Sequence, residues 1–226
     1  MRERMRPKVG VVTLGQSPRP DMVGEMRVWL GDVEPVERGA LDDLTPEQIA
    51  EVHASNGEDA LLTRLRDGSS VVVGERAMVP RLQAAISRLE AQGADAVLLA
   101  CTGPFPAFQH SRPLLLAERL LVEGAAAVAR GCRVGVICPL PEQEEATRRK
   151  WSDLFSHLHV AVGSPYGPLD ALRRAARRLR EARVEFVILD CMGYTQAMKE
   201  VVRAEAGVPV LLARSLVARL AAEVVA

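Results

Sequence analysis

The sequence predicts an α/β protein whose parallel sheets are built from βαβ units, and three observations support this fold class. Short apolar runs alternate with helical patterns along the 226 residues, as expected for a parallel sheet covered by helices. Gly93–Gly103 (GADAVLLACTG) and Arg183–Gly193 (RVEFVILDCMG) repeat one another at a constant offset of 90 residues. The opening KVGVVT, from Lys8, returns as RVGVIC, from Arg133, at an offset of 125. We therefore expect a duplicated α/β unit whose first copy carries extra residues.

The first half contains local signals for its helices and for a hairpin. Thr45 followed by Pro46 is typical of an N-cap and the first helical position. Asp67-Gly68 lies between two stretches of alternating apolar residues, which strongly favours a hairpin near residues 59–75. The predicted elements of this half are strand Val9–Leu14, helix Pro20–Leu30, strand Val33–Val36, helix Pro46–His53, the hairpin, helix Val79–Gln92, strand Ala96–Ala100 and helix Leu114–Arg130.

The second half repeats this alternation without the hairpin. The helices that precede the two matching strands also match, since Leu82 and Leu89 recur as Leu172 and Leu179. Thr195 is a suitable N-cap for the helix after the second repeat. The predicted elements of this half are strand Arg133–Cys138, helix Glu142–Phe155, strand His157–Val162, helix Pro168–Ala182, strand Phe186–Asp190, helix Thr195–Ala206, strand Val208–Leu212 and helix Ser215–Val225.

Composition restricts the function classes. Lys and Arg together number 29, as do Asp and Glu, so the formal net charge is zero and neither nucleic acid nor an anionic membrane is indicated as a partner. No apolar run has the length of a spanning helix, and the N-terminus has no signal-peptide core, so we expect a cytoplasmic protein. The four cysteines are too sparse for a disulfide framework, and the histidines show no metal-site spacing with them. We expect neither a metal nor a cofactor.

Cys101 and Cys191 are the candidate catalytic residues. Each falls at the carboxyl end of a predicted buried strand and is followed two residues later by a glycine, Gly103 or Gly193. Ligands of open parallel sheets bind at this end of the strands. Asp190 is expected to point away from Cys191 because side chains alternate along a strand.

Two thiols on either side of one carbon acid would suffice to invert its configuration. A thiolate is a competent base and a thiol a competent acid, and a free-thiol pKa of about 8.5 keeps both forms accessible near neutrality. Backbone N–H groups in the turns after the strands would stabilise a thiolate, a carboxylate or an enolate-like intermediate. The two glycines would allow the main chain to approach an anionic substrate closely.

Four loops should converge at the strand ends and supply substrate-binding groups. Arg19 is a candidate for gripping a carboxylate bidentately, although a solvated loop cation is the alternative. Cys138 ends its own strand and is a candidate for lining the pocket, His110 for folding back over Cys101, whereas Cys132 precedes its strand and is expected to be structural. The candidate substrate-binding residues are Gly15, Gln16, Ser17, Arg19, Thr102, Gly103, Pro139, Gln143, Met192, Gly193, Tyr194 and Thr195.

Five segments resemble the AroM protein family, which is similar to the aspartate/glutamate/hydantoin racemase superfamily. They are KVGVVTLGQSPRPD, TRLRDGSSVVVGE, LLACTGPFP, RVGVICPLPEQ and LDCMGYT, and they extend over essentially the whole chain. The resemblance implies two α/β domains related by pseudo-twofold symmetry, with an active-site cleft between them and one cysteine from each, here Cys101 and Cys191. It implies a first domain of residues 1–112 plus 208–226, to which the final strand returns, and a second domain of residues 113–207.

The resemblance also has departures, which leave two classes of function open. Amino-acid racemases usually follow the first cysteine with Asn-Thr and the second with Thr-His, whereas this chain has Thr102-Gly103 and Met192-Gly193. The leading hypothesis is a cofactor-independent racemase or isomerase acting on a small carboxylate-bearing substrate. Within this fold, a single-cysteine decarboxylase or an isomerase with a nucleophilic cysteine is a variant.

The second hypothesis is a non-catalytic protein that binds a small molecule or regulates through it, because fold alone does not settle function. A nucleotide-binding enzyme is excluded, since no GxGxxG follows the first strand and GxxxxGKS is absent. Pairing into homodimers through exposed helices is common for this fold class, and the sequence contains no interface signature that tests it.

Overall fold

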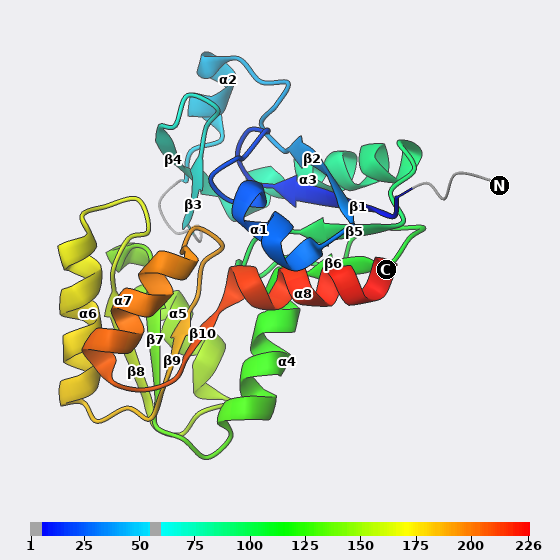
Figure 1. Ribbon diagram of the computed structural model, residues 1–226. Coiled ribbons are helices and arrows are strands. Elements are labelled where there is room, and N and C mark those ends of the chain that lie inside the picture. The colour runs from blue at the N-terminus through cyan, green and yellow to red at the C-terminus, as the bar shows by residue number, and fades with distance from the viewer. Residues whose placement is uncertain (1–5, 55–59) are drawn as a thin grey trace. The chain divides into compact units, whose positions relative to one another are not determined.

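The computed structural model describes residues 6–54 and 60–226, so residue 59 of the predicted hairpin region lies outside the described residues. The chain divides into two compact units (Figure 1). The first takes the chain up to Ala117 together with Val217–Ala226, and the second takes Glu118–Leu216. Each unit has its own four-stranded parallel sheet and covering helices, which confirms the predicted α/β class. None of the helices described is both long and apolar enough to cross a membrane.

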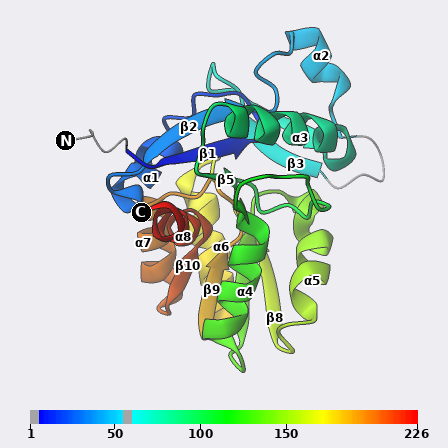
Figure 2. The ribbon, with the colours of Figure 1, turned by 90° about the vertical axis from the view of Figure 1, so that its right-hand side faces the viewer.

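The first unit combines a parallel sheet of order β2-β1-β5-β6 with the antiparallel pair β3-β4. Helix α3 lies along one face of the parallel sheet (Figure 2), and its buried side chains form one core with those of β1 and β5. The elements are β1 (Lys8–Thr13), α1 (Val23–Leu30), β2 (Glu34–Gly39), α2 (Pro46–Glu51), β3 (Ala60–Arg64), β4 (Ser70–Gly74), α3 (Glu75–Ala91), β5 (Ala96–Leu99) and β6 (Leu114–Leu116), and α4 (Ala117–Ala129) follows.

The second unit has a parallel sheet of order β10-β9-β7-β8. Helices α6 and α7 lie side by side (Figure 1) and share a core with Ile137, Val187 and Leu189 on one face of the sheet. The elements are β7 (Val134–Cys138), a 3-10 turn η1 (Pro141–Gln143), α5 (Glu144–Ser152), β8 (Leu158–Val162), α6 (Leu169–Glu181), β9 (Phe186–Leu189), α7 (Gln196–Ala206), β10 (Val210–Leu212) and α8 (Ala213–Val225).

The two sheets have the same strand order once equivalent strands are matched, and the packing repeats as well. A Cβ added to Gly10 of β1 would lie 3.0 Å from Leu89 of α3. A Cβ added to Gly135 of β7 would lie 2.8 Å from Leu179 of α6. Each unit therefore seats a leucine of its long helix against a glycine of its first strand. This shared contact supports the duplication inferred from the sequence offsets.

One element was assigned wrongly from the sequence, and one predicted strand joins a different sheet from the one expected. Leu114–Leu116, predicted as the start of a helix, is β6 and pairs with β5, because three apolar residues do not distinguish a short strand from a helical turn. The last strand, expected to return to the first domain, is β10 and pairs with β9. A short βαβ connection through α7 places successive parallel strands beside each other, and this local rule prevails over the resemblance.

The predicted hairpin turn and both helix caps are confirmed. Leu65 donates its N–H to the Ser69 carbonyl at 2.8 Å, and the turn contains Gly68 with a positive φ of 86°. Thr45 forms a capping box with Gln48, and the Thr195 hydroxyl accepts the N–H of Met198. Helix α3 begins at Glu75, earlier than predicted, and therefore holds Pro80 in its interior.

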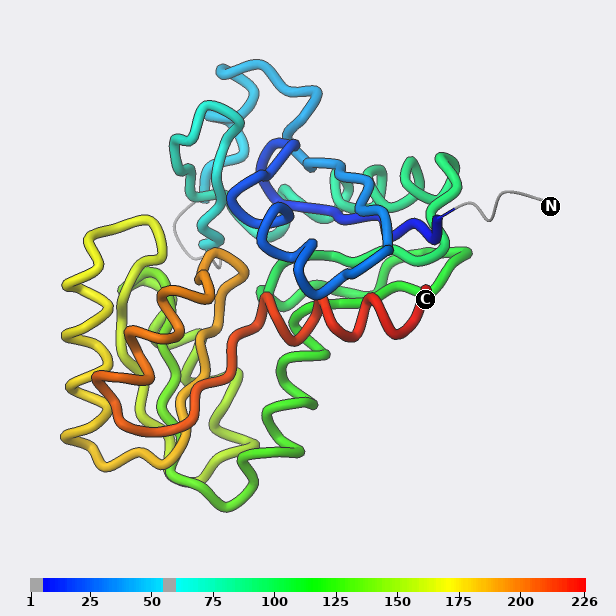
Figure 3. Tube along the Cα trace, viewed as in Figure 1, coloured from blue at the N-terminus to red at the C-terminus, as the bar shows by residue number. Residues whose placement is uncertain are grey.

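The loop after β1 is pressed against the hairpin, as the chain trace shows (Figure 3). A Cβ on Gly15 would overlap the carbonyl oxygen of Arg64 and lie 2.7 Å from Thr63 Oγ1. We expect Gly15→Ala to lower the free energy of unfolding by about 3 kcal/mol in urea titrations, because backbone must move. Gly24→Ala is the control: its Cβ meets nothing within 4 Å, so the change stays within about 1 kcal/mol. Equal losses in the two variants would contradict the steric explanation.

Candidate functional site

The two candidate cysteines have the same local geometry in their separate units. Cys101 follows β5 and Cys191 follows β9; both are half-buried, and neither forms a disulfide. The N–H of Gly103 donates to Cys101 Sγ at 3.3 Å, and the N–H of Gly193 donates to Cys191 Sγ at 3.3 Å. A hydrogen bond donated to sulfur favours the thiolate form. The Cys-x-Gly repeat thus builds the same sulfur-binding turn twice.

The glycine of each turn is needed for packing inside its own unit. A Cβ on Gly103 would lie 2.7 Å from Leu61 of β3, and a Cβ on Gly193 would lie 2.7 Å from Pro165 and 2.9 Å from the Tyr166 hydroxyl. The sequence prediction explained these glycines by the approach of a substrate. The structure supplies a different reason, which is the closeness of a neighbouring side chain.

In the first unit, Asp42 holds the loop after β1 in place. Its carboxylate accepts the N–H and the hydroxyl of Ser17, each at 2.6 Å, and the N–H of Gly39 at 2.7 Å. Arg66 of the hairpin turn reaches the same carboxylate at 3.2 Å and donates to the Ser17 carbonyl at 2.6 Å. The predicted substrate-binding Ser17 is therefore held by protein groups, and Asp42 is a structural centre that the prediction missed.

Arg19 is not a solvated cation, because its side chain is buried and paired with Asp21. It is 4% exposed, and its Nε and Nη2 donate to the two oxygens of Asp21 at 2.8 Å each. Its N–H donates to Glu37 at 2.6 Å. A substrate carboxylate at this edge of the guanidinium would have to compete with Asp21, because both need the same bidentate geometry.

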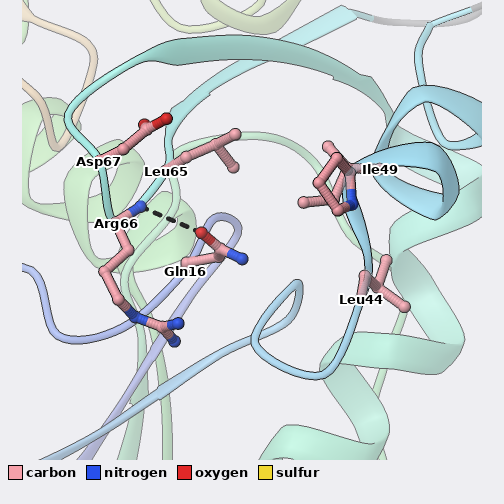
Figure 4. A pocket seen from close by; sticks show the side chains of 7 residues that line it. Gln16, Leu44, Ile49, Leu65, Arg66 and Asp67 are labelled. Atoms are coloured by element: carbon pink, nitrogen blue, oxygen red, sulfur yellow. Dashed lines mark hydrogen bonds between the residues drawn. The ribbon is translucent and has the colours of Figure 1, made fainter.

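Gln16 borders a pocket of about 470 Å³ that belongs to the first unit alone. Figure 4 shows Gln16 and Arg66 on one side and Leu44 and Ile49 on the other. The N–H of Arg66 donates to the Gln16 side-chain oxygen at 3.1 Å, and the Gln16 amide donates to the Leu41 carbonyl at 3.4 Å. The amide of Gln16 therefore bridges the hairpin and the loop after β2.

In the second unit, three predicted substrate-binding residues serve the loop itself. Tyr194 is fully buried, and its hydroxyl donates to the Gly163 carbonyl at 2.7 Å. Burial raises the pKa of Tyr194 well above its usual value, so the phenol stays neutral. Met192 is 4% exposed, and Thr195 caps α7. Tyr194 thus ties the Cys191 loop to the end of β8.

The remaining candidates are placed as follows. Thr102 and Gln143 are half-buried, and Pro139 is buried after β7. His110 is exposed, with its Nδ1 2.8 Å from the Arg112 carbonyl. The exposed position gives no support to the expectation that His110 covers Cys101.

Cys138 is a buried thiol whose pKa is raised to about 11, mainly by burial. It is 1% exposed, and its sulfur contacts the carbonyls of Leu140 and Ala161 at 3.7 Å. These contacts indicate a structural thiol rather than one lining a pocket.

The raised pKa of Cys138 predicts an alkaline loss of stability. Above pH 9 the unfolded chain releases this proton while the folded chain retains it, so stability falls as pH rises from 9 to about 11. We expect this group to contribute about 1 kcal/mol per pH unit to the slope. Cys138→Ala should show a correspondingly shallower slope in urea titrations at pH 8, 9 and 10, with Cys132→Ala as control. If the free energy of unfolding fell equally steeply with pH in wild type and in Cys138→Ala, this prediction would be wrong.

Asp190 points away from Cys191, as predicted, into a charged cluster against α5. Lys150 Nζ donates to its two oxygens at 2.9 and 3.0 Å, and Trp151 Nε1 donates at 2.7 Å. The side chains of Lys150 and Asp190 are 14% and 5% exposed, and the ammonium lies 5.2 Å from the Trp151 ring centre. This buried ion pair anchors the strand end that precedes Cys191.

Sequence reasoning missed Arg214, a residue of the second unit that contacts the Cys191 loop. It is 1% exposed, and it donates from Nε to the Met192 carbonyl at 2.9 Å and from Nη2 to the Gly193 carbonyl at 3.0 Å. The available signal was an arginine two residues after the end of the apolar strand Val210–Leu212, with no loop between strand and helix. A charge so close to an apolar run needs buried partners.

Comparison with known proteins gives a family and a fold. The family model described as AroM protein matches residues 9–225. Among solved structures, allantoin racemase from Klebsiella pneumoniae is similar with a TM-score of 0.62 and 16% identity, covering 96% of this chain and 86% of that one. A crystal structure of arylmalonate decarboxylase gives 0.61 and 18%, covering 96% and 92%.

Glutamate racemase from Aquifex pyrophilus is similar with a TM-score of 0.56 and 15% identity, covering 93% of this chain and 81% of that one. The search of curated proteins gives no match. Because the identities are low, these likenesses establish a racemase-like fold and leave the reaction to be argued from the residues.

Proposed function

The chain belongs to the AroM protein family, and from this premise we propose that it is a cofactor-independent racemase or isomerase of a small carboxylate-bearing substrate. The observation that carries the proposal is the repeated thiol geometry. Cys101 and Cys191 lie at equivalent strand ends, and each sulfur accepts a glycine N–H at 3.3 Å. The names of the fold relatives, which include allantoin and glutamate racemases, agree with a reaction at an acidic carbon.

The proposed reaction needs one thiolate and one thiol. The thiolate removes the proton on the α-carbon and becomes a thiol, leaving the electron pair on the substrate as an enolate-like anion. The other thiol then gives its proton to the opposite face of that carbon and becomes a thiolate. The product has the inverted configuration, the two sulfurs have exchanged roles, and no electron is gained or lost. Both sulfurs must therefore reach the same α-carbon.

Substrate binding is proposed to use the loops that follow the strands. Thr102 and Thr195 are half-buried hydroxyls next to the cysteine turns, and Gln143 is a half-buried amide in η1. These neutral groups and the backbone N–H groups suit a carboxylate. The polar groups of Ser17, Arg19, Tyr194 and Thr195 are bound to protein groups. These side chains therefore do not specify the substrate beyond a small carboxylate-bearing molecule.

Hydrogen exchange at the α-carbon tests the proposal. The protein is incubated in deuterated water with the chiral substrates named for its fold relatives, which are glutamate and allantoin, and with small chiral 2-substituted acids. We expect deuterium at the α-carbon of at least one compound, observed by proton NMR, together with its racemisation on a chiral column. Absence of exchange in every compound, accompanied by a covalent cysteine adduct, would replace this proposal with a nucleophilic cysteine mechanism.

The same samples separate catalysis from simple ligand binding. For a compound that raises the melting temperature without exchanging hydrogen, the melting temperature is measured again with a Cys101→Ser/Cys191→Ser double variant. If binding is unchanged in that variant and wild type never turns the compound over, the protein is a small-molecule binder with a racemase-like fold. If binding is lost in that variant, the thiols belong to the site.

A further inference from the structure

The turn that carries Cys191 contains a continuous hydrogen-bond chain that begins at Arg214. Arg214 Nε donates to the Met192 carbonyl at 2.9 Å, and this carbonyl belongs to the same peptide group as the Gly193 N–H. That N–H donates to Cys191 Sγ at 3.3 Å. The guanidinium therefore polarises the peptide whose N–H points at the sulfur. Hydrogen bonds in such a chain strengthen one another, and more so where water is excluded.

A second contact fixes the orientation of Arg214. Its Nη2 donates to the Gly193 carbonyl at 3.0 Å, so the planar guanidinium binds two successive carbonyls of the turn. Arg214 is 1% exposed, and an arginine keeps its charge at any pH at which the protein folds. A fixed, buried positive charge next to the turn stabilises a negative charge on its sulfur.

We propose that Arg214, acting through the Met192–Gly193 peptide, stabilises the thiolate of Cys191 and so makes Cys191 the thiol that begins the reaction as the base. Arg214 is thereby a positioning residue, since it acts on the sulfur through the peptide. The role of base rests on the proposed function, whereas the effect on the thiol can be measured without any substrate.

The equivalent position in the first half of the sequence makes the two thiols unequal. Leu114–Leu116 is followed by Ala117-Glu118, just as Val210–Leu212 is followed by Ala213-Arg214. In the sequence, the first half therefore has an acid, Glu118, at the position that Arg214 occupies in the second half, and this carboxyl belongs to the second unit, where it interacts with Lys150 and Asp190. Because the sequence does not repeat the arginine, the proposal assigns the thiolate to Cys191 and the proton-carrying thiol to Cys101.

The other ionisable groups near the turn oppose this effect only weakly at neutral pH. Tyr194 and Cys138 remain protonated, because burial raises the pKa of both, that of Cys138 to about 11. The carboxylate of Asp190 is balanced by Lys150 at 2.9 Å. The charged or titratable side chains on the elements around the turn include Glu118, Cys138, Glu144, Lys150, Tyr166, Asp190, Tyr194, Lys199 and Arg214.

Peptide-resolved alkylation measures this effect directly. Iodoacetamide reacts with thiolates, and trypsin places the four cysteines of the full chain on separate peptides, so the pH dependence of each rate is read by mass spectrometry. In Arg214→Gln we expect the midpoint for Cys191 to rise by about one pH unit and its rate at pH 7 to fall about tenfold. The midpoint for Cys101 in the same samples should not move, nor should that for Cys191 in the exposed control Arg219→Gln.

Arg214→Lys covers the case in which the glutamine variant does not fold. A lysine retains the charge but binds one carbonyl at a time. The Cys191 midpoint of Arg214→Lys should therefore lie between the wild-type midpoint and the midpoint about one pH unit higher that is expected without a cation. An unchanged Cys191 midpoint in a folded Arg214→Gln, or a shift of Cys101 as large as that of Cys191, would overturn the inference. Absence of exchange with every carboxylate, alongside the expected shift, would instead refute the proposed function and leave this inference standing.

Discussion

Replacing either Cys101 or Cys191 with serine is expected to lower the rate of racemisation at least about 1,000-fold. A serine hydroxyl keeps the size and hydrogen-bonding capacity of the thiol, but its proton is far too tightly held for it to act as base at neutral pH. The turn around each cysteine should survive, because the glycine N–H has an oxygen to bind. The loss is measured as the initial rate of interconversion of the enantiomers for the compound that shows hydrogen exchange.

The control for this prediction is Cys132→Ser. Cys132 is free and half-buried, and it precedes β7, at the opposite end of the sheet from the cysteine turns. The variant should racemise at the wild-type rate, within about a factor of two. If one of Cys101→Ser and Cys191→Ser kept wild-type activity, a two-thiol mechanism would be ruled out and a single-cysteine reaction favoured.

Removing the carboxylate of Asp190 is expected to have the largest effect on stability. Asp190→Ala leaves the ammonium of Lys150, which is 14% exposed, without its carboxylate partner and deprives Trp151 Nε1 of its acceptor. Breaking one side of a buried ion pair costs about 3–5 kcal/mol. We expect the free energy of unfolding in urea to fall by about that amount at pH 7.

An aspartate of the same unit provides the matched control. Asp170 is 80% exposed and lies 3.8 Å from Arg173, so Asp170→Ala should change stability by less than about 1 kcal/mol. The double variant Lys150→Met/Asp190→Leu should be more stable than Asp190→Ala, because no charge is left unpaired in it. A double variant as unstable as the single one would show that packing, and not the charge, holds this strand end.

The elements with strong local signals were predictable from the sequence. The turn at Asp67-Gly68 and the caps at Thr45 and Thr195 depend on residues within a few positions of each other, and all three are confirmed. The offsets of 90 and 125 residues also anticipated that the two sheets would have equivalent strands. These features are encoded locally or by repetition, so they can be read without knowing the tertiary contacts.

The features that the sequence did not reveal depend on which groups the fold brings together. Leu114–Leu116 is a strand because it pairs with the edge of β5, and no residue near Leu114 in the sequence indicates this pairing. Arg19 was expected to bind a ligand, but Asp21 occupies it, and whether two nearby side chains pair depends on the fold of their loop.

The cysteines of the candidate site were identifiable from the sequence, whereas the groups that tune them were not. Asp42 holds Ser17 across 25 residues, and Arg214 reaches Met192 across 22. Tyr194 was predicted to bind the substrate. Its ring lies in the core, where its hydroxyl donates to the Gly163 carbonyl. Such support for a site comes from other strands and helices, so it becomes visible only in three dimensions.

The position of solvent deuterium during the first turnovers tests the two-thiol reaction most directly. A single enantiomer of an exchanging compound is converted in deuterated water, the reaction is stopped below about a tenth of conversion, and the enantiomers are separated and analysed by mass spectrometry. Because the removed proton stays on one sulfur while the other delivers deuterium, we predict label in the product enantiomer and none in the recovered starting enantiomer. Equal label in both enantiomers would mean that one base serves both faces, and the two-thiol account would be wrong.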